Sequence, residues 1–302
     1  MLAPVSIGLR IDVDTFRGTR DGVPRLLGIL KRRGIRATWY VTLGPDNMGR
    51  HILRLLRPSF AIKMLRSSAP NLYGWDIVLR GTVWPGPIIS ARLADTLRMP
   101  DREGHEMGVH AWDHHLWQMG IDSLSDAELD AQIARASDAL ATIIGRAPTT
   151  AACPGWRCTD RVLSLPSSKS FRYRSDCRGV AAPFLPRIAG VPINQPQVPV
   201  DLPTYDEGVG RGSGADDAWN QELLRRIDDG QPHVLTIHAE SEGGSKSQLF
   251  ERFLDQAIAK GHTFEPLCDW LDRQPAAAPA TISKGRVAGR DGWLCVSDSL
   301  RR

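Results

Sequence analysis

Short runs of β-forming residues alternate with helix-like segments along this chain of 302 residues, and this alternation limits the folds that it can adopt. The strand candidates are residues 7–14, 37–43, 108–112, 149–153, 173–177 and 233–239, and the helix candidates are 23–33, 125–144, 219–229 and 248–260. Ser125 and Glu128 match the capping-box pattern that opens a helix. Such alternation favours an α/β fold with a mostly parallel sheet, open or closed into a barrel.

Two internal segments and the tail depart from this alternation. Residues 44–87 contain several prolines, which exclude a single helix and indicate an insertion of short helices and loops after the second strand; among them are Pro58, Pro70, Pro85 and Pro87. The Pro-rich stretch 191–203 suits an extended edge segment, and residues 274–280 indicate a loop. We predict one barrel over residues 1–275, with the insertion at about 44–100, and a C-terminal extension over 276–302 packed on or near the barrel.

Composition excludes several classes of protein. No apolar run approaches about 18 residues, so we expect no transmembrane helix, and the first residues lack the features of a signal peptide. The net charge of +4 is too small to indicate nucleic-acid binding. Five cysteines without a CxxC pair argue against a structural zinc site or a disulfide framework, and we expect reduced thiols in the cytoplasm.

The insertion carries a local excess of positive charge. Asp76 is the only acidic residue between Asn47 and Ala94, whereas the same stretch holds seven basic residues among its leucines: Arg50, Arg54, Arg57, Lys63, Arg66, Arg80 and Arg92. Basic segments that also contain apolar residues bind anionic membrane surfaces peripherally, without spanning the membrane. The alternative is an ordinary solvated helix packed on the barrel.

Half of the eight histidines fall within residues 105–115, and His110 and His114 are four positions apart. On a helix, or on a strand followed by a turn, this spacing lets two imidazoles share one metal ion. A pair of exposed or core histidines is the alternative.

Polar side chains also mark the ends of the strand candidates. Asp12 and Asp14 are two positions apart on the first strand and therefore face the same side. Asp176 and His238 end two later strands. In parallel α/β folds and barrels, catalytic groups collect at the C-terminal ends of strands, although each of these residues alone could be a turn or core residue.

Taken in order, these residues resemble the motifs of the polysaccharide deacetylase (NodB-homology, carbohydrate esterase 4) family: Asp12-x-Asp14, His110-x-x-x-His114, Pro154-Gly155-Trp156, Asp176 and Leu235-x-Ile237-His238. Longer stretches resemble the branch of this family that removes a formyl group from a formamido-arabinose carried on undecaprenyl phosphate. They are RIDVDTFRGTRDGVPRLL, GPDNMGRH, LYGWDI, GVHAWDHH, SDCRG, TIHAE and the tail segment AGRDGW. The resemblance covers nearly the whole chain and implies a distorted (β/α) barrel.

The resemblance also implies roles for individual residues. One divalent metal ion (zinc, manganese or cobalt) would be held by Asp14, His110 and His114, a set that leaves open positions. Asp12 would be the general base, and His238 the general acid that protonates the leaving amine. Asp176 would orient His238. Many members place an arginine against the base aspartate, where this chain has Ala152; Arg157 or Arg178 replaces it, or Asp12 lacks that partner.

A second set of residues gives weaker candidates for substrate contacts. Arg17 and Arg20 follow Asp14 in a loop, where they contact a phosphate or carry solvated charge. Trp156 stacks on a sugar or packs in the core. His115 and Glu240 follow catalytic motifs, and Arg157 and Arg178 flank them.

The resemblance implies a substrate linked to undecaprenyl phosphate and a peripheral place on the cytoplasmic face of the bacterial inner membrane. An N-acetyl deacetylase acting on another amino sugar, and a non-catalytic protein that binds a sugar lipid, are the alternatives. The intact set of candidate catalytic residues argues against a non-catalytic protein.

Overall fold

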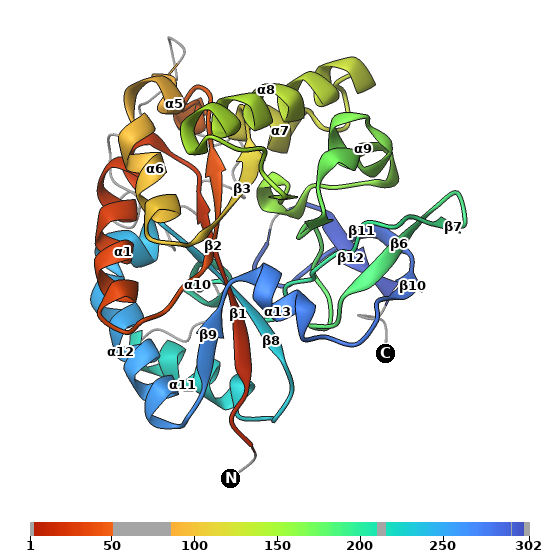
Figure 1. Ribbon diagram of the computed structural model, residues 1–302. Coiled ribbons are helices and arrows are strands. Elements are labelled where there is room, and N and C mark those ends of the chain that lie inside the picture. The colour runs from red at the N-terminus through yellow and green to blue at the C-terminus, as the bar shows by residue number, and fades with distance from the viewer. Residues whose placement is uncertain (1–2, 51–85, 210–215, 291, 299–302) are drawn as a thin grey trace, which may run out of the picture.

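The computed structural model describes residues 3–50, 86–209, 216–290 and 292–298 (Figure 1). The strands are β1 (Ser6–Val13), β2 (Thr38–Thr42), β3 (Glu106–Ala111), β4 (Thr150–Ala151), β5 (Tyr173–Arg174), β6 (Phe184–Ile188), β7 (Val191–Pro192), β8 (His233–His238), β9 (Thr263–Glu265), β10 (Ala278–Ala280), β11 (Ile282–Gly285) and β12 (Leu294–Ser297). The helices are α1 (Val23–Lys31), α5 (Ile89–Arg92), α6 (Ala94–Arg102), α7 (His114–Gly120), α8 (Asp126–Ile144), α9 (Asp160–Ser164), α10 (Tyr205–Val209), α11 (Asp216–Ile227), α12 (Ser247–Ala259) and α13 (Leu267–Asp272). The Ser125–Glu128 capping box is present at α8.

The main sheet is parallel throughout, with the strand order β5-β4-β3-β2-β1-β8, and it curls into a distorted barrel. Strand β1 pairs with β8 through Ile7–Asp12; it also pairs with β2 through Arg10–Val13 and with β9 through Ser6–Gly8. The C-terminal ends of β1, β2, β3 and β8 therefore meet at one rim.

An extended stretch bridges the sheet between β5 and β8. Val198 N donates to Arg174 O at 2.8 Å on the β5 side, and Leu202 N donates to Val234 O in β8 at 3.4 Å. The predicted extended segment over 191–203 is confirmed in part: Val191–Pro192 form the edge strand β7, whereas residues 197–202 span the gap between the two outer strands of the main sheet rather than lying at an edge.

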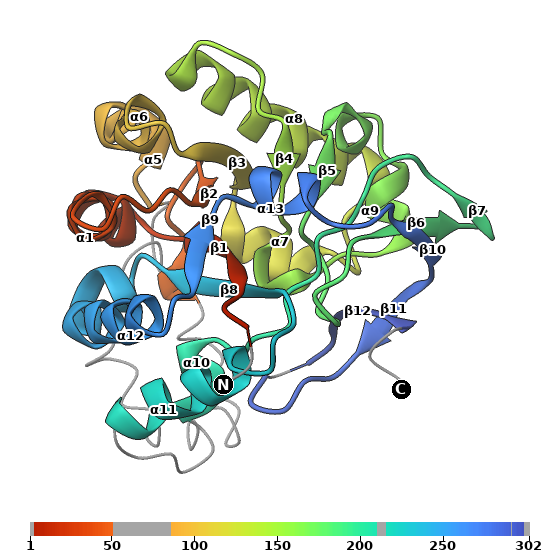
Figure 2. The same cartoon turned by 60° about the horizontal axis from the view of Figure 1, so that its bottom comes forward.

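Successive side chains of β1 point alternately to the helices outside the sheet and into the barrel. Ile7, Leu9 and Ile11 pack in the larger hydrophobic cluster with the apolar faces of α1 and α12. The helices α6, α1 and α12 lie side by side outside the strands, as Figures 1 and 2 both show. Gly8, Arg10 and Asp12 face the other way, into the barrel, so β1 itself places a buried arginine and a buried carboxylate inside.

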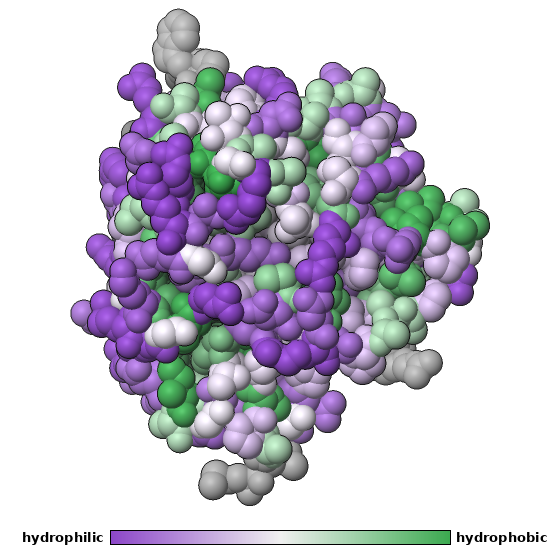
Figure 3. Space-filling view, in the orientation of Figure 1, coloured by the Kyte–Doolittle hydropathy of each residue, from purple (hydrophilic) through white to green (hydrophobic). Residues whose placement is uncertain are grey.

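The tail returns to the barrel after the last helix. Strands β11 and β12 form an antiparallel hairpin, and Leu294 and Cys295 of β12 are buried. Strand β10 pairs with β6, whose hairpin with β7 projects from the body. Figure 3 shows apolar surface gathered at that projection, where Val191 is 66% exposed.

The predicted α/β barrel class is confirmed. Helices α5 and α6 follow β2, as expected of the insertion, but its basic stretch over 51–85 lies outside the described residues, so the membrane-facing element predicted there stays a prediction. No helix in the described ranges combines the length and the apolar character that a membrane span needs.

Candidate active site

Asp12 lies on β1 inside the barrel, with 2% of its surface exposed. Arg10, two positions earlier on the same face of the strand, is fully buried and clamps this carboxylate through Nε–Oδ1 and Nη2–Oδ2 contacts of 2.7 Å each. Burial disfavours the Asp12 carboxylate, but Arg10, together with His110 and His238, outweighs burial and holds the pKa of Asp12 below its ordinary value. Arg10 therefore favours the ionised form of Asp12 and fixes the orientation of its carboxylate.

The sequence left open whether Arg157, Arg178 or no arginine partners Asp12, and the structure places Arg10 there instead. Neither Arg157 nor Arg178 takes that position. Arg178 forms an ion pair with Glu207 at 3.2 Å, and the guanidinium of Arg157 lies 4.7 Å from the Trp293 ring centroid. The signal for Arg10 was present in the sequence, because Arg10 and Asp12 share one face of an apolar strand and a lone charge there is costly to bury.

A second group at the same rim comprises Asp14, His110 and His114, whose ligand atoms all lie within 4.8 Å of one another. Asp14 follows β1, and its two carboxylate oxygens lie 3.2 Å from His110 Nε2 and 3.3 Å from His114 Nε2. His110 is near the end of β3, and His114 is the first residue of α7, with Asp113 as the N-cap. The four-residue spacing therefore works through a strand and a turn rather than along one helix.

The hydrogen bonds of this group fit a metal ion. His110 Nδ1 lies 2.7 Å from the carbonyl oxygen of Ala152, which can only accept, so Nδ1 carries the proton and Nε2 keeps its lone pair toward Asp14. Among the described residues, the buried Asp14 Oδ1 has no hydrogen-bond partner. Two imidazole nitrogens and one carboxylate oxygen are a donor set that divalent first-row metals accept. These three residues could therefore hold such an ion.

His238 ends β8, directly beside Asp12 in the parallel register of β1 and β8. Its backbone N–H donates to Glu242 Oε2 at 2.9 Å. Burial disfavours the imidazolium, but the carboxylates of Asp14, Asp206 and Asp12 outweigh burial and raise the pKa of His238. The ring is thus held toward its protonated form, which is the form that a general acid needs.

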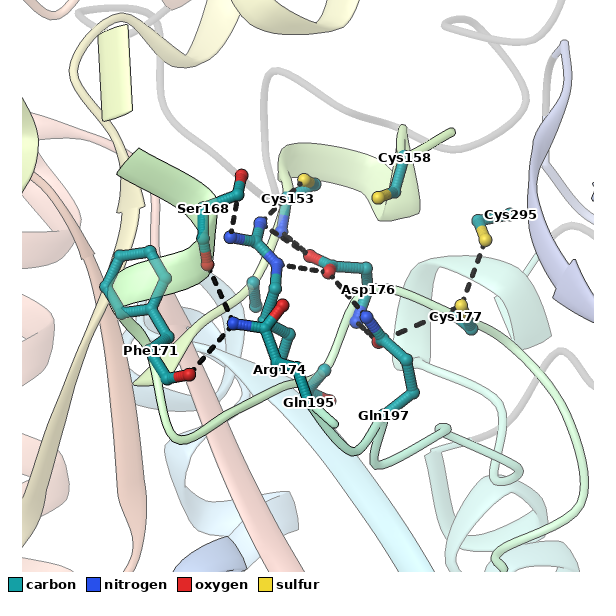
Figure 4. Close-up of polar contacts among 12 residues, drawn as sticks. Cys153, Cys158, Ser168, Phe171, Arg174, Asp176, Cys177, Gln195, Gln197 and Cys295 are labelled. Carbon is teal, nitrogen blue, oxygen red and sulfur yellow. Dashed lines mark hydrogen bonds and ion pairs between the residues drawn. The ribbon is translucent and has the colours of Figure 1, made fainter. Parts of the chain in front are cut away.

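The hydrogen bonds of Asp176 go to the barrel wall, and none of those among the described residues reaches His238, so its predicted role in orienting His238 stays a prediction. Asp176 is fully buried, and its carboxylate lies 2.6 Å from Arg174 Nε and accepts hydrogen bonds from Cys153 N at 2.7 Å and Gln197 Nε2 at 3.1 Å (Figure 4). Arg174 stands two positions before Asp176, which repeats the spacing of Arg10 and Asp12. Because its carboxylate is paired with Arg174, Asp176 stabilises the wall of the barrel.

Glu240 holds the loop that carries Asp14. Its Oε1 accepts hydrogen bonds from Asp14 N at 3.0 Å, from Thr15 N at 2.8 Å and from Thr15 Oγ1 at 2.7 Å. Burial and the nearby Asp14 raise the pKa of Glu240 to about 7. The Oε1 atom of Glu240 is therefore bonded to the Asp14–Thr15 segment, and the predicted contact of Glu240 with substrate stays a prediction.

The other candidates for substrate contact divide into two groups. Trp156 is only 1% exposed, so stacking on a sugar is excluded and the core alternative is correct. Arg20 pairs with Asp21 at 2.7 Å in a half-exposed helical turn over Gly18–Gly22, and Arg17 reaches the same carboxylate at 4.0 Å. His115 is half-buried next to His114. The roles of Arg17, Arg20 and His115 with substrate stay predictions.

The fold and this group of residues define a class. The family model described as polysaccharide deacetylase matches residues 6–173, and the chain belongs to this family of hydrolases acting on amide bonds, as its motifs indicate. It is 48% identical over 295 residues to the "Probable 4-deoxy-4-formamido-L-arabinose-phosphoundecaprenol deformylase ArnD" of Shewanella sediminis (strain HAW-EB3), covering 97% of this chain and 95% of that protein. A protein of the same name from Wigglesworthia glossinidia brevipalpis is 36% identical over 286 residues, covering 94% and 99%.

The solved structures agree on the fold. The crystal structure of a "probable Polysaccharide deacetylase" from Pseudomonas aeruginosa PAO1 superimposes with a TM-score of 0.57 at 16% identity, and the match covers 90% of this chain and 92% of that one. At this identity the likeness supports the barrel alone, so the chemistry has to be argued from the residues of this chain.

Proposed function

We propose that this chain is a metal-dependent deformylase that acts on 4-deoxy-4-formamido-L-arabinose carried on undecaprenyl phosphate. The products are the 4-amino sugar, still on its carrier, and formate. One observation carries the proposal: a group that could hold a metal ion, Asp14 with His110 and His114, lies beside an arginine-clamped Asp12 that is in register with His238. Two relatives of nearly the same length, both named as deformylases of this sugar lipid, support the choice of substrate.

The proposed reaction needs one proton acceptor and one proton donor. When bound, a divalent ion would polarise the formamide carbonyl and acidify a water molecule. Asp12 accepts the proton of the attacking water, since Arg10 keeps its carboxylate ionised and directed. His238 donates its proton to the sugar nitrogen as the C–N bond breaks, because an unprotonated amine is a poor leaving group. The identity of the ion is open among zinc, manganese and cobalt, which this donor set suits.

We also propose that the protein works peripherally at the cytoplasmic face of the bacterial inner membrane. There the amino sugar would supply lipid A modification and resistance to polymyxin and cationic peptides. Two facts support this: the carrier named for the relatives is a lipid, and residues 47–94 contain seven basic residues against one acid. A flotation assay with anionic vesicles tests it. The test variant replaces five cations by Gln: Arg50, Arg54, Arg57, Lys63 and Arg66. This variant should no longer float with the vesicles, and unchanged partitioning would contradict the membrane role.

Mass measurement of the lipid-linked sugar, before and after incubation with the metal-loaded protein, tests the reaction. Loss of a formyl group is expected with wild-type protein and not with Asp12→Asn, which keeps the size of the side chain and removes the base. An unchanged formamido sugar, combined with release of acetate from an N-acetylated amino sugar, would replace the proposal with a deacetylase.

A further inference from the structure

The C-terminal tail contributes no group to the proposed reaction, yet it is built into the wall behind the general base. Strand β12 bonds to the segment after β5, where Arg178 N donates to Cys295 O at 2.9 Å and Ser297 N donates to Arg178 O at 3.1 Å. Cys295 has no exposed surface. The tail is therefore a fixed part of the barrel wall, and the side chains that it sends inward can act on the interior.

Arg290 is the cation that the tail sends inward. Its Nε donates to Glu207 Oε1 at 2.8 Å, and the same oxygen accepts from Arg178 Nη1 at 3.2 Å. Glu207 is only 1% exposed, so two guanidinium groups are fixed around one buried carboxylate. The Arg290 guanidinium also lies 4.5 Å from the ring centroid of Trp156, and that of Arg178 lies 5.0 Å from it.

Trp156 joins this cluster to the base. The indole of Trp156 is buried, and the backbone of this residue adopts a left-handed conformation with φ of 55°. Only tight packing sustains this conformation for a residue of this size. The Arg10 guanidinium lies 5.1 Å from the same ring centroid, and Arg10 holds both oxygens of Asp12. A continuous set of contacts thus runs from Arg290 through Trp156 and Arg10 to Asp12.

We infer that Arg290 is a positioning residue for the general base: it fixes Trp156, whose ring fixes the Arg10 fork on Asp12. The inference rests on the proposed role of Asp12. A bidentate guanidinium–carboxylate pair is directional, and the indole limits the rotation of the Arg10 fork. Without the Arg290 guanidinium, the Trp156 ring and the Arg10 guanidinium become more mobile. The Asp12 carboxylate then spends less time oriented toward the attacking water. A misplacement of about 1 Å can lower a rate about a hundredfold.

The test compares Arg290→Met, Arg290→Lys and a matched tail variant, Lys284→Met. Lys284 is also a tail cation, and it lies 4.3 Å from the ring centroid of a different tryptophan, Trp293, outside this cluster. For Arg290→Met we expect kcat to fall about tenfold or more, with KM and bound metal unchanged. Arg290→Lys keeps a cation for Glu207 and Trp156 and should recover most of the loss. Lys284→Met should match wild type.

Three results would overturn the inference: wild-type kcat in Arg290→Met, a loss of kcat that parallels a loss of metal, or an equal loss in Lys284→Met. Folding is checked by circular dichroism, and Glu207 keeps Arg178 as a partner in the variant. If Arg290→Met does not fold, Arg290→Gln replaces it with the same expectation, because Gln can donate to Glu207 but carries no charge. Failure of the proposed function is distinct, because wild-type protein would then release no formate at all.

Discussion

The buried pair of Arg10 and Asp12 should be strongly coupled in stability, and a double-mutant cycle measures that coupling directly. The two changes are Arg10→Met, which keeps a similar stem without charge, and Asp12→Asn, which keeps the shape of the carboxylate. Both side chains are almost fully buried, with 0% and 3% of their surfaces exposed, so solvent cannot stabilise whichever charge is left alone.

The structure sets the size of the effect. Removing one member of a buried ion pair costs about 3–5 kcal/mol, because the other charge stays buried without compensation. Arg10→Met also removes the hydrogen bond to Ser175 O and the contact 4.9 Å from the Tyr40 ring centroid. Asp12→Asn costs less, since its amide oxygen still accepts from Arg10. The double variant leaves no buried charge at this pair, so we expect a coupling of about 2–3 kcal/mol.

Urea unfolding of metal-free protein supplies the four free energies of unfolding. The matched control is the same cycle at Arg33 and Asp255, a bidentate pair with distances of 2.8 and 2.9 Å whose carboxylate side chain is 61% exposed. Solvent screening should keep its coupling below about 1 kcal/mol. A coupling at Arg10 and Asp12 no larger than that of the control would refute the view that the clamp holds a buried carboxylate ionised.

Three further outcomes follow from the same geometry. Asp14→Ala should lose bound metal and activity together, as metal analysis and formate release would report; retention of one equivalent of metal would contradict the assignment. His238→Gln should keep the metal and lose about 10²–10⁴ in kcat, the range of general acid–base catalysis, and a smaller loss would remove His238 from that role. Burial lowers the pKa of His105 to about 4, and its Nδ1 accepts from Ala37 N at 3.0 Å. As the pH falls, His105 is therefore protonated in the unfolded state before it is protonated in the folded state. Its contribution to the free energy of unfolding is fully present above about pH 6.5 and falls by about 2 kcal/mol toward pH 4, after allowing for partial solvent access. Urea unfolding of His105→Gln should lack this component, and an identical pH dependence in the variant would exclude it.

The sequence was sufficient for the elements that a periodic pattern specifies. The apolar alternation of β1, the capping box of α8 and the polar residues at strand ends were read correctly, because each depends on residues close in the chain. Pairing between distant segments left no such pattern. Residues 197–202 bridge β5 and β8 through backbone hydrogen bonds, which depend little on side-chain type, and the extended stretch therefore looked like an edge.

The candidate site shows the same division. The grouping of Asp14 with His110 and His114 followed from spacing and family motifs, whereas the partners of the carboxylates did not. Arg10 and Arg174 each stand two positions before the aspartate that they hold; Arg10 and Asp12 share one face of β1, and Asp176 lies two residues past the end of β5. That local rule could have predicted both pairs. The contacts of Arg290 could not be predicted, because they depend on how the tail returns to the barrel.

The central claim is that one metal ion, held by Asp14, His110 and His114, makes this barrel a deformylase. Titration of metal-free protein with a divalent metal, while NMR follows formate release from the formamido-arabinose lipid, tests it most directly. We predict that the rate rises linearly up to one equivalent of metal and then stays constant, and that Asp14→Ala shows no such rise. Full formate release by the metal-free protein, or a rate that needs a second equivalent, would contradict the account.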